Sequence, residues 1–398
     1  MDLSQIERKK VVHLVTDEKF INNVIKLIKW YPGNNKHEFI YIKLFNNKLK
    51  FICELSEVKV FTLKELYKYI NRELPSAIIL HNFLSAPLKF IQKIPSNIKV
   101  FWFSWGLDLY NFPSKKPLIC IQKYHLKTLE YIKNSSNKYL HINFKPSYFL
   151  KYYRKLAIKR RNIIQFGINE TKNYHKAISR VDYFSSVIDT EFEDLKVYPF
   201  FRAEKVKFTY GLPIVIEDLS SIKFSGNSIL IGNSASLSNN HLDILSILKE
   251  KNILNKKIYM PLSYAGNKVY IDNVIKKGLK ILNKNFNPLT EFISFEDYTE
   301  ILKDCKVGIF MNERQEGMGN INYLLRQGSK VFLSETSQIY KWYKTNGVKV
   351  FSIQNDLTDE AIDVELTEEE KNSNRKIIIK NLTKDSFKKQ LDIIYSKI

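Results

Sequence analysis

Short runs of apolar and β-branched residues alternate with longer amphipathic stretches, and this alternation occurs twice along the 398 residues. Continuous apolar runs are typical of parallel strands buried on both faces, and the amphipathic stretches are typical of the helices that cover such a sheet. The sequence therefore predicts an α/β protein with two parallel-sheet layers.

The strands of the first layer are expected in the N-terminal half. They are Lys10 to Val15, Glu38 to Lys43, Val58 to Phe61, Ala77 to His81, Lys99 to Ser104 and Val181 to Ser185. Glu18 to Trp30 has the spacing of an amphipathic helix between the first two strands. The stretch that begins with Tyr198-Pro199-Phe200 has no readable periodicity.

The second layer restarts the alternation. Its expected strands are Ser228 to Gly232, Lys257 to Leu262, Lys306 to Phe310, Lys330 to Leu333 and Val348 to Phe351. Its expected helices are His241 to Lys249, Lys268 to Lys280, Gly319 to Arg326 and Thr383 to Lys397. Asp356 to Glu370 is interpreted as an acidic connector.

One further helix is predicted from its start signal. Ser294 and Asp297 supply the hydroxyl and carboxylate of a capped helix start. Apolar residues follow at helical spacing and are expected to form one buried stripe. They are Phe295, Tyr298, Ile301 and Leu302.

Two successive layers predict two domains, with a boundary near Phe208 to Ser225. Residues 1–210 form the first domain, residues 211–375 form the second, and residues 376–398 are expected to form a helix that packs back on the first domain. Ligands bind such sheets at the carboxyl ends of the strands, so both sets of loops are expected to face one central cleft. This is the GT-B arrangement of glycosyltransferases, with two Rossmann-like domains.

Charge and cysteine content narrow the function classes. A formal net charge of +22 attracts nucleic acid, anionic membranes or phosphorylated substrates, although a genome that favours Lys, Asn and Ile codons explains the excess equally well. Cys53, Cys120 and Cys305 are far apart and odd in number, which argues against a disulfide framework and a thiolate zinc site. No apolar run is long enough to span a bilayer, and the start lacks a signal segment, so a cytoplasmic protein is expected.

The first candidate site is the loop after the strand that begins at Ser228. Gly232, Asn233 and Ser234 are small or polar residues that let backbone amides approach an anion, and Asn239 or Asn240 is expected to cap the following helix. An ordinary strand-to-helix turn rich in capping residues is the alternative.

The second candidate site is the loop that follows Phe310. Gly317 and Gly319 free the backbone at a helix start, and Arg314 adds a positive charge, so a diphosphate would fit. Glu313 or Glu316 is a candidate acceptor for a nucleotide hydroxyl, unless either is a solvated surface carboxylate. Neither loop matches a P-loop or a G-x-G-x-x-G pattern.

In the first half, Asp108 follows a strand among aromatic residues that include Trp105 and Tyr110. A carboxylate in an apolar cleft can act as a general base, and a turn aspartate packed beneath tryptophans is the alternative. His81 also ends a strand, and it is either an acid, base or acceptor-binding group or a core histidine. No His or Cys spacing indicates a transition metal, and no D-x-D motif follows a strand.

A basic stretch from Tyr148 to Arg161 interleaves aromatic and aliphatic residues with Lys and Arg. Such a helix can lie on an anionic bilayer, and the same pattern describes any packed surface helix. The residues expected to contact the membrane are Tyr152, Tyr153, Arg154, Lys155, Arg160 and Arg161.

Several motifs, taken in order, carry a family resemblance. They are Ile231-Gly-Asn-Ser234, Ser238-Asn-Asn-His241, Met260-Pro-Leu-Ser-Tyr264 with Asn267 and Tyr270, Phe295-Glu-Asp-Tyr298, Arg314-Gln-Glu-Gly-Met-Gly319 and, in the first half, Trp102 with Trp105-Gly-Leu-Asp-Leu-Tyr110. Together they resemble the TDP-N-acetylfucosamine:lipid II N-acetylfucosaminyltransferases of bacteria. The chain departs from that family's pattern at Phe103, where a histidine is usual, and at Glu316, where a glutamine is usual.

The resemblance implies a GT-B enzyme that transfers 4-acetamido-4,6-dideoxygalactose, or a similar deoxyamino sugar, from a dTDP-sugar to a polyprenyl-diphosphate-linked saccharide, with inversion and without a cofactor or essential metal. Asp108 is the expected base, and His81, Trp105 and Tyr110 are the expected acceptor contacts. The expected donor contacts are Gly232, Asn233, Ser234, Tyr264, Arg314, Gln315, Glu316, Gly317, Gly319 and Asn320. Because the acceptor carries a lipid, peripheral attachment to the cytoplasmic face of the inner membrane is expected.

Two other hypotheses remain open on the sequence alone. A basic nucleic-acid-binding protein would show salt-sensitive binding, although the chain lacks a recognisable recognition motif. A sugar-nucleotide epimerase or phosphorylase would keep the fold and change the reaction, and an epimerase would need no acceptor.

Overall fold

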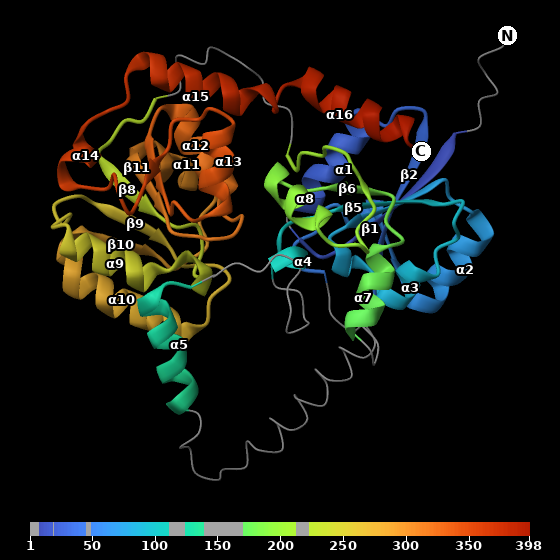
Figure 1. Ribbon diagram of the computed structural model, residues 1–398, viewed down its shortest axis with the longest axis horizontal. Coiled ribbons are helices and arrows are strands. Elements are labelled where there is room, and N and C mark those ends of the chain that lie inside the picture. The colour runs from blue at the N-terminus through green and yellow to red at the C-terminus, as the bar shows by residue number, and fades with distance from the viewer. Residues whose placement is uncertain (1–7, 19, 45–48, 111–123, 139–169, 212–222) are drawn as a thin grey trace. The chain divides into compact units, whose positions relative to one another are not determined.

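The protein is described by a computed structural model that covers residues 8–18, 20–44, 49–110, 124–138, 170–211 and 223–398. The chain divides into two compact units. Unit 1 contains Met1–Cys120, Phe144–Val215 and Leu382–Ile398, and unit 2 contains Ile121–Asn143 and Ile216–Asn381. Each unit is built around one sheet with helices on both faces (Figure 1).

The sheet of unit 1 has seven parallel strands in the order β3-β2-β1-β4-β5-β6-β7. Its strands are β1 (Lys9–Val15), β2 (Asn35–Ile42), β3 (Val58–Phe61), β4 (Ala77–His81), β5 (Lys99–Phe103), β6 (Tyr183–Ser185) and β7 (Glu204–Lys205). Its helices are α1 (Phe20–Trp30), α2 (Leu63–Glu73), α3 (Leu88–Gln92), α4 (Leu107–Tyr110), α7 (Glu170–Ile178), α8 (Asp189–Lys196) and α16 (Lys384–Ser396).

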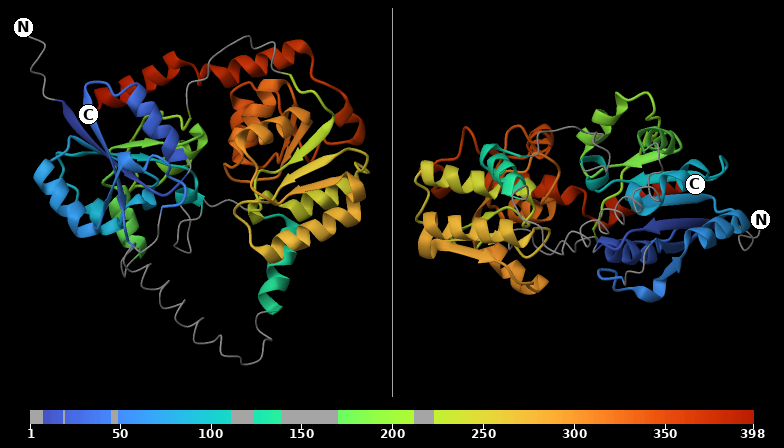
Figure 2. Two further views of the ribbon diagram at one scale, coloured as in Figure 1. Left: turned by 180° about the vertical axis from the view of Figure 1, so that it is seen from behind. Right: turned by 90° about the horizontal axis from the view of Figure 1, so that it is seen from below.

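One face of this sheet is covered by α1 and α16, which lie together beside the strands (Figures 1 and 2). Ile21 and Val24 of α1 and Phe387 of α16 belong to the same apolar cluster as Val11 and Ile79 of the sheet. Because alternate strand residues point to the same face, His13, His37 and His81 also lie on this side.

The sheet of unit 2 has six parallel strands in the order β10-β9-β8-β11-β12-β13. Its strands are β8 (Ser228–Ile231), β9 (Ile258–Pro261), β10 (Phe286–Leu289), β11 (Cys305–Phe310), β12 (Lys330–Leu333) and β13 (Phe351–Ser352). Its helices are α5 (Leu126–Lys138), α9 (His241–Glu250), α10 (Lys268–Leu282), α11 (Phe295–Asp304), α12 (Met318–Gln327), α13 (Gln338–Thr345), α14 (Asp359–Asp363) and α15 (Glu368–Lys380).

Helix α5 comes from the first half of the sequence but packs in unit 2, against α9 (Figure 1). The Asp243 carboxylate of α9 accepts hydrogen bonds from the Lys127 and Thr128 amides, at 2.7 and 2.9 Å, and from the Thr128 hydroxyl at 2.6 Å. The first turn of α5 is therefore capped by a side chain of another helix.

Two sequence expectations about local structure were wrong. Phe295 is 78% exposed, and Leu302 is the one buried member of the expected stripe on α11, so this helix buries only its C-terminal end. The expected acidic connector contains α14 and the start of α15, both with threonine caps, because acidic residues stabilise helix N-termini. The elements that the sequence does not predict include strands β7 and β10 and helices α2, α5, α7, α8 and α13.

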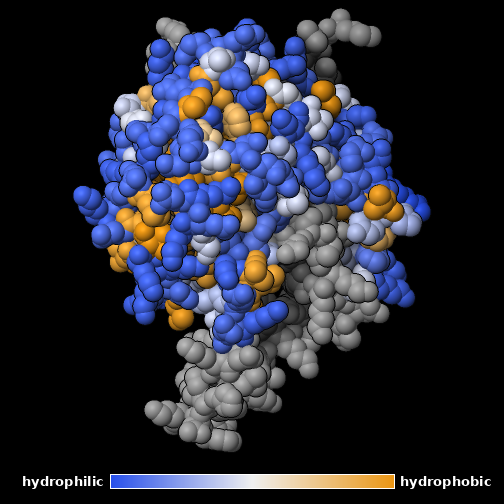
Figure 3. Space-filling view, turned by 60° about the vertical axis from the view of Figure 1, so that its left-hand side comes forward, coloured by the Kyte–Doolittle hydropathy of each residue, from blue (hydrophilic) through white to orange (hydrophobic). Residues whose placement is uncertain are grey.

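Hydrophilic side chains predominate on the face shown in Figure 3, with groups of hydrophobic residues between them. Within the described ranges, no helix combines the length and the apolar character that crossing a membrane requires.

Candidate functional site

Two neighbouring strands of unit 2, β8 and β11, place their loops side by side. They pair in parallel, with Ile231 beside Ile309, and the Gly232 amide continues the pairing by donating to the Ile309 carbonyl at 3.0 Å. Gly317, at the start of α12, has a φ of +71°, and a Cβ there would lie 3.2 Å from Asn233 Oδ1. Glycine is therefore required where the two loops approach each other.

Asn239 organises the first loop. Its Oδ1 accepts from the Asn233 amide at 2.9 Å, its Nδ2 donates to Ser234 Oγ at 3.2 Å, and its side chain is fully buried. Gly232 has a φ of +69°, and a Cβ there would come within 2.7 Å of Asn239 Oδ1. Gly232, Asn233 and Ser234 therefore form one compact turn.

The expectation that an asparagine side chain caps α9 was wrong. Asn240 stands at the N-cap position, but its side chain makes no capping bond. Its Nδ2 donates to the carbonyls of Ser238 and Met311, and its Oδ1 accepts from the His125 amide at 2.9 Å. Asn240 therefore links the two loops with the segment before α5.

Arg314 and Glu316 form an ion pair in the second loop. The Glu316 carboxylate also accepts from Ser238 Oγ and from Asn312 Nδ2, each at 2.6 Å. Both side chains are largely buried, at 12% and 14% exposed, so Glu316 is not a solvated surface carboxylate. Glu316 joins the two loops to each other.

Glu313 is held by three side chains. Its Oε1 contacts His125 Nε2 at 2.6 Å and accepts from Ser334 Oγ at 2.5 Å, and its Oε2 accepts from Thr336 Oγ1 at 2.8 Å. Burial would raise the pKa of Glu313, but the hydrogen bonds from His125, Ser334 and Thr336 outweigh it and lower that pKa. Both oxygens of Glu313 are thus engaged inside unit 2.

The open part of this site lies at the start of α12. A Cβ on Gly319 would meet no atom within 4 Å, so the backbone of the first helical turn is accessible. Asn320 lies in the same turn and donates to the Tyr298 hydroxyl at 2.8 Å, and Gln315 is half-buried. Nearby, Asn233 Oδ1 and Asn312 Oδ1 are buried acceptors without a hydrogen-bond partner among the described residues. A helix N-terminus with an accessible backbone is suited to an anion.

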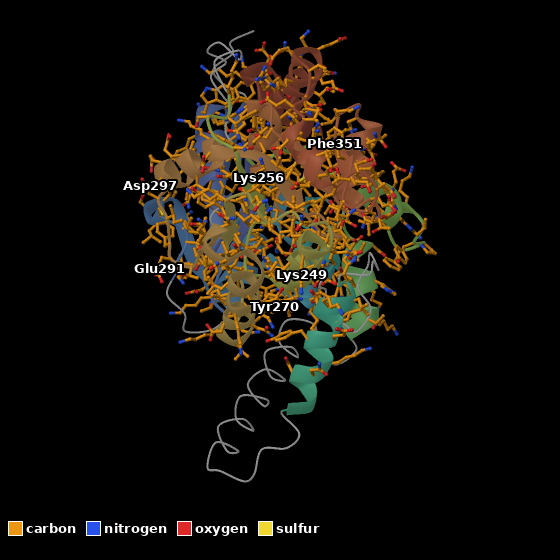
Figure 4. All side chains as sticks on the ribbon, turned by 90° about the vertical axis from the view of Figure 1, so that its left-hand side faces the viewer. Lys249, Lys256, Tyr270, Glu291, Asp297 and Phe351 are labelled. Atoms are coloured by element: carbon orange, nitrogen blue, oxygen red, sulfur yellow. The ribbon has the colours of Figure 1, made fainter. Side chains whose placement is uncertain are left out.

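His241 lies against the first loop and is hydrogen-bonded to Tyr270. His241 Nδ1 lies 3.1 Å from the Tyr270 hydroxyl on α10, which Figure 4 labels. Burial lowers the pKa of His241 to about 3, so its ring is neutral. Tyr264, one of the expected donor contacts, is 52% exposed on the loop after β9, and its carbonyl accepts from the Ala235 amide at 2.8 Å.

In unit 1, the Asp108 carboxylate is fully buried. Oδ2 accepts from the Phe83 amide at 2.9 Å and from Trp102 Nε1 at 2.6 Å, and Oδ1 accepts from Ser104 Oγ at 2.9 Å and the Trp105 amide at 3.3 Å. Burial raises the pKa of Asp108, and these hydrogen bonds oppose that effect. The geometry favours the alternative of a structural aspartate, because both oxygens are saturated and inaccessible.

The expected acceptor contacts are brought only partly together. Trp105 packs edge-on against Tyr210, with ring centroids 5.2 Å apart, and His81 Nδ1 lies 2.9 Å from the Tyr210 hydroxyl. Tyr110 is fully buried instead, beside Glu191, whose pKa burial raises to about 8 against the lowering effect of the Tyr110 hydroxyl. Tyr110 is therefore not positioned to contact an acceptor, since no part of it is exposed.

Sequence reasoning missed Tyr210, His125 and Asn312. Tyr210 lies in the region without readable periodicity, and His125 lies 188 residues before its partner Glu313, so neither had a local signal. Asn312 is the second residue after β11 and could have been found from that position. The six expected membrane contacts between residues 152 and 161 lie outside the described residues.

The comparisons with known proteins agree with this arrangement. Residues 202–382 match the sequence family described as 4-alpha-L-fucosyltransferase, glycosyl transferase group 56. These residues include both loops of the unit 2 site. At 45% of the chain, the match covers unit 2 apart from the α5 segment.

Solved structures are similar over the whole chain. HepE of Anabaena in complex with UDP-glucose has a TM-score of 0.60 and 10% identity, covering 98% of this chain and 100% of that one. Sucrose-phosphate synthase of Thermosynechococcus elongatus has a TM-score of 0.61 and 9% identity, covering 98% and 99%. A glycosyltransferase of Rickettsia africae has a TM-score of 0.57 and 11% identity, covering 98% of both chains. At such identities the likeness shows the fold, which is GT-B. The chain is a glycosyltransferase with the GT-B fold, and its residues 202–382 are similar to the group 56 family.

Proposed function

We propose that this glycosyltransferase moves a deoxyamino sugar of the 4-acetamido-4,6-dideoxygalactose type from a dTDP-sugar to a polyprenyl-diphosphate-linked saccharide in the synthesis of a bacterial surface polysaccharide. Unit 2 binds the donor and unit 1 binds the acceptor. The observation that carries the donor assignment is the pair of loops after β8 and β11, which meet at Gly317 and Asn233 beside the accessible start of α12.

The donor diphosphate is seated on the α12 N-terminus. The free amides of the first helical turn offer hydrogen bonds and a positive dipole end, and Gly319 leaves room for close approach. Arg314 supplies a guanidinium, but its ion pair with Glu316 must open or be shared for a phosphate to reach it. Asn233 Oδ1 and Asn312 Oδ1 are acceptors suited to hydroxyls of the transferred sugar or of the deoxyribose.

The transfer is an inverting displacement. The acceptor hydroxyl oxygen attacks the anomeric carbon of the donor sugar, the bond from that carbon to the phosphate oxygen breaks, and dTDP leaves with the electron pair. Oriented amides and a cation at the leaving phosphate stabilise the charge that develops there. We expect no metal to be required, and transfer in the presence of EDTA tests this part of the proposal.

The lipid of the acceptor implies contact with a bilayer. The net charge of +22 and the basic stretch of residues 148–161 support attachment to an anionic surface, at the cytoplasmic face of the inner membrane. Exchange of Arg154, Lys155, Arg160 and Arg161 for Gln should release the protein from anionic liposomes in sedimentation. Parent-like sedimentation of this variant would exclude this stretch as the membrane contact.

Thermal-shift measurements with dTDP, UDP, GDP and their sugars test the donor assignment. A ligand that binds only the folded protein raises its apparent melting temperature, so dTDP and its sugars should stabilise the protein most. An exclusive response to UDP or GDP would contradict the proposed donor. Incubation of the donor alone, followed by analysis of the sugar, separates transfer from epimerisation.

A further inference from the structure

We propose that Tyr210, His81, His13 and His37 form a proton path across unit 1, which takes up at Tyr210 the proton that the acceptor hydroxyl loses and holds it at His37. The proposal rests on the proposed function in one respect, that the acceptor binds at the carboxyl edge of the unit 1 sheet. Any transfer to a hydroxyl must dispose of one proton, whatever the sugar.

The four side chains are joined by an unbroken series of hydrogen bonds. The Tyr210 hydroxyl lies 2.9 Å from His81 Nδ1, His81 Nε2 lies 2.9 Å from His13 Nδ1, and His13 Nε2 lies 2.8 Å from His37 Nδ1. The series ends at the carbonyl of Pro32, 3.0 Å from His37 Nε2.

The direction of every hydrogen bond follows from that last contact. A carbonyl can only accept, so His37 carries its proton on Nε2. In neutral rings His37 Nδ1 then accepts from His13 Nε2, His13 Nδ1 accepts from His81 Nε2, and His81 Nδ1 accepts from the Tyr210 hydroxyl. Burial is the main cause that lowers the pKa of all three histidines, for His81 to about 3, so the rings are neutral.

The series crosses three neighbouring strands, from the carboxyl end of β4 through β1 to the first half of β2. His81 is the last residue of β4, His13 lies in the middle of β1, and His37 lies near the start of β2. His13 and His81 are fully buried in the layer beneath α1 and α16, whereas His37 is only partly buried. Of the three rings, His37 is therefore the one on which a positive charge costs least.

The proton balance is simple. As the acceptor oxygen bonds to the anomeric carbon its O–H becomes strongly acidic, and its proton passes to the Tyr210 oxygen. Tyr210 gives its own proton to His81 Nδ1, His81 gives its Nε2 proton to His13 Nδ1, and His13 gives its Nε2 proton to His37 Nδ1. His37 is then an imidazolium with protons on both nitrogens. After the product leaves, the reverse shift returns one proton through Tyr210 to water.

In the described part of unit 1, charged and titratable groups lie near both ends of the path. Burial raises the pKa of Tyr210, the Asp108 charge adds to this effect, and the Tyr210 ring packs edge-on against Trp105. His37 packs against Tyr395 of α16, with centroids 5.5 Å apart, and α16 also presents Asp392 to Tyr31 and Lys388 over the Tyr31 ring. Among the described residues no carboxylate has a hydrogen bond to any of the three rings.

Nitrogen-15 NMR of the histidine side chains in the unliganded parent protein tests the path without any donor. At pH 7 we expect His13, His37 and His81 to be neutral, each with the proton on Nε2 and an acceptor on Nδ1. A proton on Nδ1 of any of the three, or a resting imidazolium, breaks the series and overturns the proposal.

Kinetics test whether the path acts in transfer. His37→Asn keeps an acceptor oxygen for His13 Nε2 but cannot take up a proton, so a structural role survives and a proton role does not. We expect kcat to fall about 10-fold or more for His37→Asn and about 100-fold for Tyr210→Phe, with unchanged donor KM. His175→Asn is the matched control, because His175 lies in unit 1 outside the series and stacks on Phe200.

The solvent isotope effect gives a second readout that a structural role does not move. In the parent, kcat should depend on the deuterium fraction along a curve, since several protons move together, and in His37→Asn the dependence should become linear. Parent-like kcat and a parent-like curve in His37→Asn would overturn the path.

If the parent fails with dTDP-sugars but transfers from another donor, the proposed donor fails and the same variants are tested with the active donor. If it uses none, the NMR result decides the path alone.

Discussion

Glu316 occupies the guanidinium of Arg314 before any diphosphate binds. The same carboxylate accepts from Ser238 and Asn312, so it pins both loops of the donor site. A bound diphosphate would compete with Glu316 for the same cation and would be repelled by its negative charge. Glu316 is thus the residue of this site whose charge opposes the proposed ligand.

Glu316→Gln should therefore bind dTDP more tightly, by about 10-fold, because a charge-assisted hydrogen bond from Arg314 to phosphate becomes available. The amide can still accept from Ser238, so the loops stay linked. Titration of dTDP by calorimetry at low and moderate salt measures the effect. Glu360→Gln is the matched control, since Glu360 is exposed on α14 and the change of net charge is the same. Equal or weaker affinity in Glu316→Gln would contradict this view of the site.

Gly319→Ala separates binding from stability. The new Cβ meets no atom of the free protein within 4 Å, and alanine is the better helix former by about 0.5–1 kcal/mol, so the free energy of unfolding should rise slightly. If the diphosphate approaches this backbone, the methyl group should weaken dTDP binding several-fold. Denaturant unfolding and dTDP titration on the same sample give both values. Gly347→Ala serves as control, because Gly347 has a φ of +76° and lies after α13, where substitution lowers stability but leaves dTDP affinity unchanged.

At the scale of elements, α5 is the helix whose place in the fold differs most from its place in the sequence. It lies in the first half of the chain but packs in unit 2. Its first turn is held by the Asp243 carboxylate, and the preceding residue His125 reaches Asn240 and Glu313. The start of α5 is therefore fastened to the loops that carry the proposed donor site. A change that loosens the start of α5 should therefore also weaken the contact between His125 and Glu313.

Asp243→Ala should destabilise the first turn of α5, because it removes the cap. Loss of the cap costs about 1 kcal/mol of local stability, which is enough to speed amide hydrogen exchange in residues 126–138 several-fold. Mass-spectrometric hydrogen exchange measures this directly. Asp272→Ala, on the exposed side of α10, should leave the exchange of α5 unchanged. Unaltered exchange in Asp243→Ala would show that the α9 carboxylate does not hold this helix.

The sequence was sufficient to predict the bounds of elements that have a local signal. Val58–Phe61, Ala77–His81 and Lys330–Leu333 match the expected strands to the residue, because each is a short run of mostly apolar residues. The weakly apolar β10 and the two-residue β7 were missed, since their place depends on pairing with a neighbouring strand. The spacing of residues on α11 predicted a buried stripe that the structure exposes, because periodicity cannot tell how deep a helix packs.

The residues of the candidate site likewise fall into two groups, those with a local sequence signal and those without one. Glycines at a helix start and polar residues after strands are local features, so the sequence predicts the two loops that contain Gly232, Asn233, Gly317 and Gly319. The saturation of Asp108 depends on donors from a neighbouring loop, and the histidine series depends on the register of three strands. Such contacts join distant parts of the chain and leave no local pattern.

At the scale of the whole molecule, buried titratable groups tie stability to pH from both sides. His13, His37, His81 and His241 are neutral in the folded protein, with pKa values lowered mainly by burial, and would titrate near 6.5 when unfolded. Below pH 6.5 the unfolded state binds more protons, so stability falls as the pH falls, by up to about 1.4 kcal/mol per pH unit for each histidine.

Glu191 makes the folded protein less stable as the pH rises. Burial raises its pKa to about 8, so the folded carboxyl stays protonated up to that pH, whereas the unfolded one ionises near 4.5. Between these values the folded state binds one more proton than the unfolded state, and stability is lost as the pH rises, by at most about 1.4 kcal/mol per pH unit. Above pH 8 both states are ionised and the loss ends.

Glu191→Gln should abolish this alkaline loss, because the amide resembles the neutral carboxyl and does not ionise. Denaturant unfolding followed by tryptophan fluorescence suits the test, since Trp30, Trp102 and Trp105 lie in unit 1 with Glu191. Between pH 6.5 and 8 the parent should lose roughly 1–2 kcal/mol relative to the variant. Glu193→Gln, an exposed neighbour on α8, should follow the parent. Parallel curves for the parent and Glu191→Gln would mean that Glu191 is already ionised in the folded protein, so that its burial beside Tyr110 does not hold the proton.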